Sequence, residues 1–88
     1  MIKVVRAEPA GEFKLKLSFS TGESGVYDFA DLIARPGAMV APLRAETYFA
    51  RYFIELGALA WPNGFDLSPK ALYETLRNAG KLAREHAA

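Results

Sequence analysis

The feature that most constrains the fold is a strict alternation of apolar and polar residues between positions 13 and 20. Phe13, Leu15, Leu17 and Phe19 alternate with Lys14, Lys16, Ser18 and Ser20. Because successive side chains of a β-strand point to opposite faces, the four apolar residues share one face and the two lysines lie on the other. The segment is predicted to be a strand that covers a core on one side and faces water on the other.

The residues on either side of this segment predict an antiparallel meander. Residues 2–5 form a short apolar run with β-branched residues, and the Pro-Ala-Gly sequence at 9–11 breaks it. Residues 20–23 have the composition of a tight hairpin turn, in which Gly22 is free to adopt a positive φ. Residues 24–27 return as a further strand, so a three-stranded meander is expected in the first third of the chain.

Short helices and a second hairpin are expected in the middle of the chain. Asp28 is placed to cap a helical turn over residues 29–34, because its carboxylate can accept hydrogen bonds from free backbone amides. A helix of about two turns is predicted near residues 43–50, and a helix this short is stable only when it packs on other elements. Residues 52–56 and 58–61 are predicted as two strands joined at a glycine.

The last part of the chain carries a clear helix start. Ser68 can accept amide hydrogen bonds as the N-cap, and Pro69 follows at the first helical position, where its missing donor is harmless. The helix is predicted over residues 69–78, with Gly80 as its C-terminal cap. Residues 81–88 are expected either to extend the helix or to fray.

These elements predict one α+β domain over residues 1–80. Its antiparallel sheet is expected to have about five strands, the meander plus the second hairpin, packed with a short helix and the C-terminal helix. A chain of 88 residues is long enough for one domain, and a hydrophobic share of 51% supports a core.

Composition excludes several classes of protein. The chain has no cysteine, which excludes disulfides, thiolate metal sites and cysteine nucleophiles and favours a cytoplasmic location. No apolar run of about 20 residues is present to span a membrane, and charged residues interrupt the N-terminus too early for a signal peptide. Lys and Arg number 11 against 10 Asp and Glu, so the basic excess typical of nucleic-acid binders is missing.

No catalytic, metal-binding or cofactor-binding constellation is recognisable. The one histidine, His86, lies near the C-terminus, where a general base is poorly held in place. Capping and complementation of the helix dipole explain Asp28 and Asp31 better than catalysis does. Ser68 has no base beside it in the sequence, and there is no glycine-rich phosphate loop. The chain is therefore expected not to be an enzyme and to bind no metal or cofactor.

The basic residues suggest an alternative function, weak association with nucleic acid. The candidate contacts are Lys14, Lys16, Lys70, Arg77, Lys81 and Arg84. Two of them project from the alternating strand, and four lie in the C-terminal region. A solvated face of mixed charge is the favoured explanation, because no interleaved aromatic residues of the kind that stack on single strands accompany the lysines.

The most distinctive stretch is the sequence Trp-Pro-Asn-Gly-Phe-Asp-Leu at residues 61–67. The favoured interpretation makes Trp61 a core side chain beside a demanding turn, with Asn63-Gly64 supplying the positive φ. The alternative is an exposed recognition surface, since aromatic residues are enriched at interfaces. Its candidate residues are Tyr48, Tyr52, Trp61, Asn63 and Asp66.

A series of motifs runs through the chain in a fixed order. They are Leu15-x-Leu17-x-Phe19-Ser20-x-Gly22-Glu23, Pro42-Leu43-Arg44 before Phe49, Gly57, Trp61-Pro62-Asn63-Gly64-x-Asp66-Leu67, and Tyr73. Over roughly residues 2–76 they resemble the DUF2442 family of domains, to which no function is assigned. The resemblance implies a small α+β domain of bacterial type, and it supplies no catalytic residue.

The resemblance also implies something about partners. Some members of the family are fused to a C-terminal helix-turn-helix domain, and others are encoded beside a second small protein, as toxin–antitoxin pairs are. This chain ends soon after its last predicted helix, so we expect it to lack the DNA-binding part.

The leading hypothesis is therefore a non-enzymatic protein-interaction module, one half of such a gene pair. Nucleic-acid association is the second hypothesis, and an enzyme with a dispersed site around Asn63, Asp66 and Tyr73 is the third. Self-association through an open sheet edge is compatible with each of them.

Overall fold

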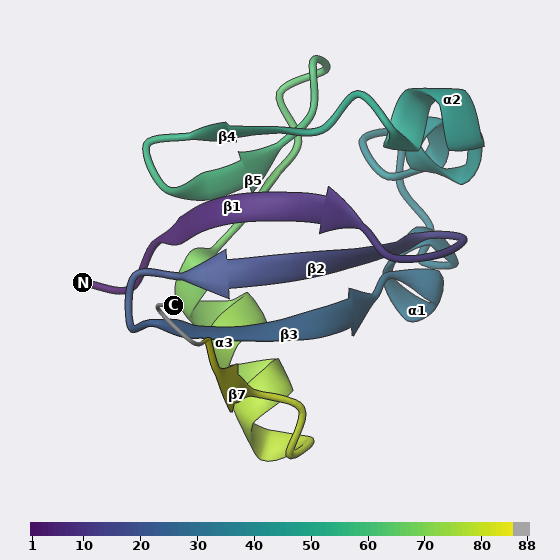
Figure 1. Ribbon diagram of the computed structural model, residues 1–88. Coiled ribbons are helices and arrows are strands. Elements are labelled where there is room, and N and C mark those ends of the chain that lie inside the picture. The colour runs from purple at the N-terminus through teal and green to yellow at the C-terminus, as the bar shows by residue number, and fades with distance from the viewer. Residues whose placement is uncertain (86–88) are drawn as a thin grey trace.

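The computed structural model describes residues 1–85 and has an α+β fold with two antiparallel sheets (Figure 1). The strands are β1 (Val4–Pro9), β2 (Lys14–Phe19), β3 (Glu23–Asp28), β4 (Phe53–Glu55), β5 (Ala58–Ala60), β6 (Asp66–Leu67) and β7 (Ala83–Arg84). The helices are α1 (Ala30–Ile33), the 3-10 helix η1 (Ala41–Arg44), α2 (Glu46–Phe49) and α3 (Pro69–Asn78). One sheet has the order β1-β2-β3-β7, and the other has the order β4-β5-β6.

The α+β class is confirmed, but the strands form two sheets where one was expected. The meander and the second hairpin, predicted as parts of one sheet, belong to separate hydrogen-bonded ladders. The two additional strands, β6 and β7, have two residues each. Strands this short carry too few residues for period-two alternation to reveal them.

The predicted N-terminal meander forms, but its first strand, expected over residues 2–5, runs from Val4 to Pro9. β2 pairs antiparallel with β1 and with β3, and Leu15, Leu17 and Phe19 are buried on its inner face. Phe13 lies just before the strand with φ +53°, and its ring packs edge-on against Phe49 with 5.3 Å between the centroids. Lys16 lies on the outer face, as the alternation requires.

Helix α3 and the second hairpin complete the core. Figure 1 shows α3 behind β2 and β3, and Leu72 and Leu76 of this helix are buried in the same cluster as Leu17. The β4–β5 hairpin lies beside β1, where the Val4 amide donates a 2.8 Å hydrogen bond to the Gly57 carbonyl.

The helix expected over residues 43–50 is interrupted. η1 ends at Arg44, Ala45 adopts an extended conformation with ψ 121°, and α2 then starts at Glu46. Leu43 and Phe49 are both buried, although two side chains six positions apart on a regular helix point in different directions. The break at Ala45 is what lets both side chains reach the core.

The C-terminal helix begins and ends where the sequence predicts. The Ser68 hydroxyl accepts a 3.3 Å hydrogen bond from the Ala71 amide, and Pro69 occupies the first turn. At the other end, the Gly80 amide donates to Arg77 at 3.0 Å and the Lys81 amide donates to Leu76 at 2.9 Å. This pair of bonds is a Schellman motif, which needs the positive φ that Gly80 provides.

The residues after Gly80 do not extend the helix. Ala83 and Arg84 form β7 instead, which pairs antiparallel with Ser24 and Glu23 at the edge of the four-stranded sheet. The chain reaches this edge by passing close over Gly25, where an added Cβ would lie 2.6 Å from the Lys81 carbonyl oxygen. The part of the segment beyond Glu85, including His86, lies outside the described residues.

Between residues 1 and 85 no helix has the length and apolar character needed to cross a membrane.

Candidate functional site

Trp61 is buried, so it belongs to the core and not to an exposed recognition surface. Only 1% of its surface is accessible. The centroid of its ring lies 5.7 Å, 5.9 Å and 6.3 Å from the ring centroids of Phe49, Phe65 and Phe29. Its indole Nε1 donates a 2.9 Å hydrogen bond to the Phe49 carbonyl at the end of α2. A buried indole N–H requires such a partner.

Asn63 holds the turn after Trp61 in shape. Its Oδ1 accepts a 3.1 Å hydrogen bond from the Phe65 amide, and its Nδ2 donates to the Met39 carbonyl at 3.0 Å. The Asn63 amide donates to the Tyr48 hydroxyl at 2.8 Å. The structure therefore brings Tyr48, Trp61 and Asn63 together, and it uses them to join the turn to α2 and to the loop before η1.

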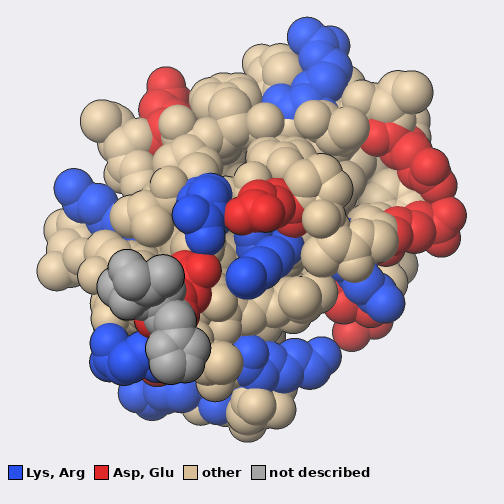
Figure 2. Space-filling view, viewed as in Figure 1, with Lys and Arg blue, Asp and Glu red and all other residues tan. Residues whose placement is uncertain are grey.

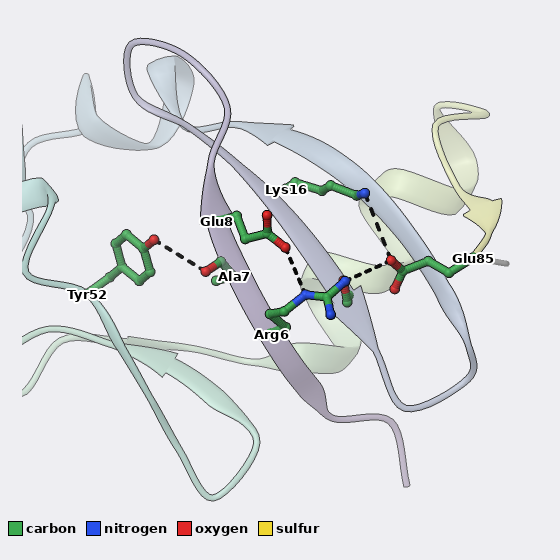
Figure 3. A network of polar contacts seen from close by, with 7 residues as sticks. Arg6, Ala7, Glu8, Lys16, Tyr52 and Glu85 are labelled. Carbon is green, nitrogen blue, oxygen red and sulfur yellow. Dashed lines mark hydrogen bonds and ion pairs between the residues drawn. The ribbon is translucent and has the colours of Figure 1, made fainter. Parts of the chain in front are cut away.

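Tyr52 closes part of the outer edge of β1 (Figure 3). Its hydroxyl donates a 3.3 Å hydrogen bond to the Ala7 carbonyl. Burial raises the pKa of the Tyr52 hydroxyl, and the charge of Glu8 adds to the shift. Asp66, the last of the five candidates, is exposed in β6 and pairs with Ala60 through the backbone ladder.

The basic candidates are not gathered into one patch. On the outer face of the meander, Arg6 contacts Glu8 at 2.8 Å and Glu85 at 3.0 Å, and Lys16 lies 3.9 Å from Glu85 (Figure 3). Figure 2 shows that basic and acidic side chains are interspersed over this face. Lys16 therefore belongs to a mixed-charge network, the arrangement favoured for these residues from the sequence.

The remaining basic candidates lie in three different places. Lys14 and Lys81 line one hollow on the outer side of β3, and Lys70 borders another beside Ile2 at the start of α3. Arg84 approaches the β2–β3 turn, where its Nη1 would lie 3.1 Å from a Cβ added to Gly22, and the charges of Arg84 and Arg77 both help to lower the pKa of Glu23. Lys14 thus lies near Lys81, and Arg77 and Arg84 lie near Glu23, but the six candidates form no single patch.

Tyr73, proposed for a dispersed catalytic site, is engaged with Glu23. Its hydroxyl donates a 2.5 Å hydrogen bond to Oε1 of Glu23. This bond is the main cause that lowers the pKa of Glu23 and raises the pKa of Tyr73. Asn63 has its own structural partners, so the two residues serve separate parts of the fold. Within residues 1–85 no cluster of three metal-ligating side chains is present.

A carboxylate pair lies at a groove near the β1–β2 turn. A hydrogen bond and the charge of Glu12 raise the pKa of Glu46. The groove has a volume of about 390 Å³, and both residues line it together with Lys14 and Tyr52. The negative charge of Glu12 thus disfavours ionisation of Glu46.

The exposed side chains of the second hairpin were not predicted as a site. Phe53, Ile54 and Leu56 are exposed at 41%, 36% and 95%. Leu56 and Gly57 form the two-residue turn, and both have positive φ, +51° and +83°. Such turns favour Asn-Gly, so the Leu-Gly dipeptide is the sequence signal that would have identified this position.

Comparison with models of known families places the chain in one of them. The model of the family described as "Protein of unknown function (DUF2442)" matches residues 4–78. Neither the curated proteins nor the solved structures contain a match. The matched range runs from the start of β1 to the end of α3 and includes both hairpins and the Trp61 turn. The chain therefore belongs to the DUF2442 family.

Proposed function

We propose that this protein is a non-enzymatic protein-interaction module that binds its partner through the tip of the β4–β5 hairpin. The observation that carries the proposal is Leu56, which combines 95% exposure with a φ of +51°. A left-handed backbone costs a non-glycine residue about 1–2 kcal/mol, and an exposed leucine gains nothing from burial. Both features oppose stability, so a role in binding accounts for them.

Phe13 provides the contrast that gives this observation its weight. It also has a positive φ, +53°, but its ring is partly buried and packs on Phe49. Packing therefore offsets the strain at Phe13. Leu56 has no such compensation within the described chain, and strained residues that packing does not explain are concentrated at functional sites.

The hairpin also presents a surface that a partner can bury. Phe53 and Ile54 are partly exposed on β4, directly before the turn. The hairpin is anchored to β1 through the hydrogen bond between Val4 and Gly57. Lys3 packs directly against the turn, because a Cβ added to Gly57 would lie only 2.7 Å from the Lys3 Cβ. A rigid apolar tip of this kind suits an apolar pocket on another protein, because little conformational entropy is lost on binding.

The partner we propose is the small protein encoded beside this one, in an arrangement like a toxin–antitoxin pair, with both acting in the cytoplasm. The mixed charge of the outer face supports a protein partner over a nucleic acid, whose binding needs clustered phosphate contacts. The lack of cysteine supports a reducing compartment.

The test is to express the product of the adjacent gene and to measure its affinity for this chain by calorimetry. Leu56→Asn places a residue suited to the turn at the same position, so the variant should fold more stably and bind at least about tenfold more weakly. Met39→Asn removes another exposed apolar side chain, away from the hairpin, and should bind normally. Equal binding by the Leu56 variant, or no binding by the unaltered chain, would overturn the proposal.

A further inference from the structure

One half of strand β3 has no neighbour on its outer edge. From Ser24 to Asp28 the strand pairs with β2, but its register with β7 covers only Glu23 and Ser24. Among residues 1–85 no strand pairs with residues 25–28 on that side. The chain before β7 leaves the edge here, because it passes over the face of the sheet at Gly25.

The backbone of Val26 faces this open edge. The Phe29 amide donates to the Phe13 carbonyl on the β2 side, and the Glu85 amide donates to the Gly22 carbonyl on the β7 side, both at 2.9 Å. Because hydrogen-bonding direction alternates along an antiparallel strand, Tyr27 faces β2 and Val26 faces away. The N–H and C=O of Val26 are therefore directed outward, and its side chain is 41% exposed.

Two hollows flank this edge, one toward each face of the sheet, and Val26, Asp28 and Lys81 border both of them. The inner hollow has a volume of about 420 Å³ and lies between α1 and the end of α3. Its lining combines apolar and charged side chains, among them Leu32, Leu76, Ala79, Asp31 and Arg35. The outer hollow has a volume of about 360 Å³ and is lined by Lys14, Val26, Asp28 and Lys81. An added strand would point successive side chains into the two hollows in turn.

We propose that this open half of β3 receives an extended segment of a partner protein, which joins the sheet as an additional strand. The segment would place an apolar side chain against Leu32, Leu76 and Ala79 of the inner hollow and an acidic side chain beside the lysines of the outer one. Two lysines against one aspartate leave the outer hollow with a positive balance. Main-chain hydrogen bonds to Val26 would supply affinity, and the two hollows would supply specificity.

The other edge of the same sheet is closed to such a strand. The Val4 amide is bonded to Gly57, and the Ala7 carbonyl accepts from Tyr52. Pro9 has no amide to donate and lies at the end of β1. Strand addition is thus directed to β3.

A second copy of this chain is a poorer occupant than an acidic segment. Antiparallel pairing of two copies about Val26 would bring the Lys14 and Lys81 side chains of both copies to the same edge. Like charges placed opposite each other destabilise a strand pair. A partner segment with acidic side chains meets the same lysines favourably.

The experiment is a selection of random octapeptides displayed on phage, followed by titration of the synthetic peptides into the nitrogen-15-labelled full chain. We expect enriched peptides in which acidic and apolar residues alternate. The amides of residues 26–28 should shift, and exchange of the Val26 amide hydrogen should slow. Leu56→Asn should leave this binding unchanged, which separates it from the function proposed for the hairpin.

Two variants and one control decide the outcome. Val26→Pro removes the outward donor without touching the bonds to β2, and Lys81→Glu reverses the charge of the outer hollow; each should weaken binding at least about tenfold. Lys70→Glu makes the same charge change away from both hollows and should bind normally. The proposal fails if no peptide is enriched, if Lys81→Glu binds normally, or if light scattering shows a dimer that Val26→Pro dissociates.

Discussion

The indole nitrogen of Trp61 and the backbone carbonyl of Phe49 are joined by a 2.9 Å hydrogen bond inside the core. This bond ties the residue that follows β5 to the last residue of α2. The Phe49 carbonyl lies at a helix terminus, where backbone acceptors lack partners within the helix. Trp61 therefore fills the core and satisfies a buried acceptor with the same side chain.

Trp61→Phe should lower the free energy of unfolding by about 2–4 kcal/mol, because a cavity forms and the Phe49 carbonyl loses its shorter hydrogen bond, keeping only the 3.4 Å bond from the Tyr52 amide. Urea denaturation followed by far-ultraviolet circular dichroism measures this loss without the tryptophan signal. Phe53→Leu, a change of similar size at a partly exposed position, should alter the free energy much less, by about 0.5 kcal/mol. Equal effects of the two changes would contradict the role assigned to Trp61.

Asn63→Ala should destabilise the protein by about 1–3 kcal/mol, since two side-chain hydrogen bonds in the turn are lost. Asn63→Asp keeps the acceptor for the Phe65 amide but replaces the donor to the Met39 carbonyl. Its stability should therefore lie between that of the unaltered protein and that of Asn63→Ala. Thermal unfolding of the three proteins at pH 7 provides the comparison. A loss confined to partner binding, with stability unchanged, would show that Asn63 acts in recognition.

The sequence predicts best those elements that depend on residues close together in the chain. Local signals were sufficient for the alternating strand β2, for the capped ends of α3 and for the Asn63-Gly64 turn, because each depends on residues close together in the chain. The break at Ala45 and the strand at Ala83 depend on distant packing. No local pattern records that Leu43 and Phe49 must enter one core.

The fold depended on local signals more than the candidate surface does. The favoured interpretation of Trp61 as a core side chain agrees with its burial, whereas the alternative needed exposed aromatic anchors, and Tyr48 and Tyr52 are half-buried and bonded to the backbone. The exposed apolar residue is Leu56, whose significance depends on a φ angle as well as on residue type. Exposure is a property of the assembled layers, so composition alone does not reveal it.

Gly25→Ala should destabilise the protein by about 1–3 kcal/mol, because the new methyl group overlaps the Lys81 carbonyl. The clash would displace the segment that leads into β7. Gly80→Ala has open space around it and is limited by its φ of +69°, so its cost of about 1 kcal/mol should arise without loss of β7. Amide exchange of Ala83 and Glu85, whose N–H groups face β3, distinguishes the two variants: it should accelerate only in Gly25→Ala.

Stability should fall at both ends of the pH range through the Glu23–Tyr73 bond. The pKa of Glu23 is lowered mainly by Tyr73, so its contribution is present above its unfolded pKa and is lost as pH falls through the folded one. The pKa of Tyr73 is raised mainly by Glu23, so its contribution is present below about 10 and is lost as pH rises further.

Tyr73→Phe should therefore flatten the acid side of the stability profile and remove part of the alkaline loss. The remaining alkaline loss belongs to Tyr52, whose pKa burial also raises. Urea denaturation at closely spaced pH values measures both limbs. An unchanged acid limb in Tyr73→Phe would exclude this bond as its cause.

Glu12→Gln should stabilise the protein at neutral pH and have little effect in acid. The pKa of Glu46 is raised through Glu12, so the folded state binds a proton more readily than the unfolded chain does. Stability is then lost as pH rises through the raised pKa of Glu46, and removing the Glu12 carboxylate restores it. Glu74→Gln, on the exposed side of α3, is the matched control and should show no such pH-dependent gain.

The pairing of β7 with β3 also sets the order in which the sheet can be completed on the ribosome. Glu23 pairs with Arg84 and Ser24 with Ala83, contacts between distant parts of the chain, whereas the β1–β3 meander closes locally and early. The last strand can join only after residues 83–84 have left the exit tunnel and α3 has packed. Until then the whole outer edge of β3 stays unpaired, so during synthesis this edge is the part of the sheet most open to mispairing.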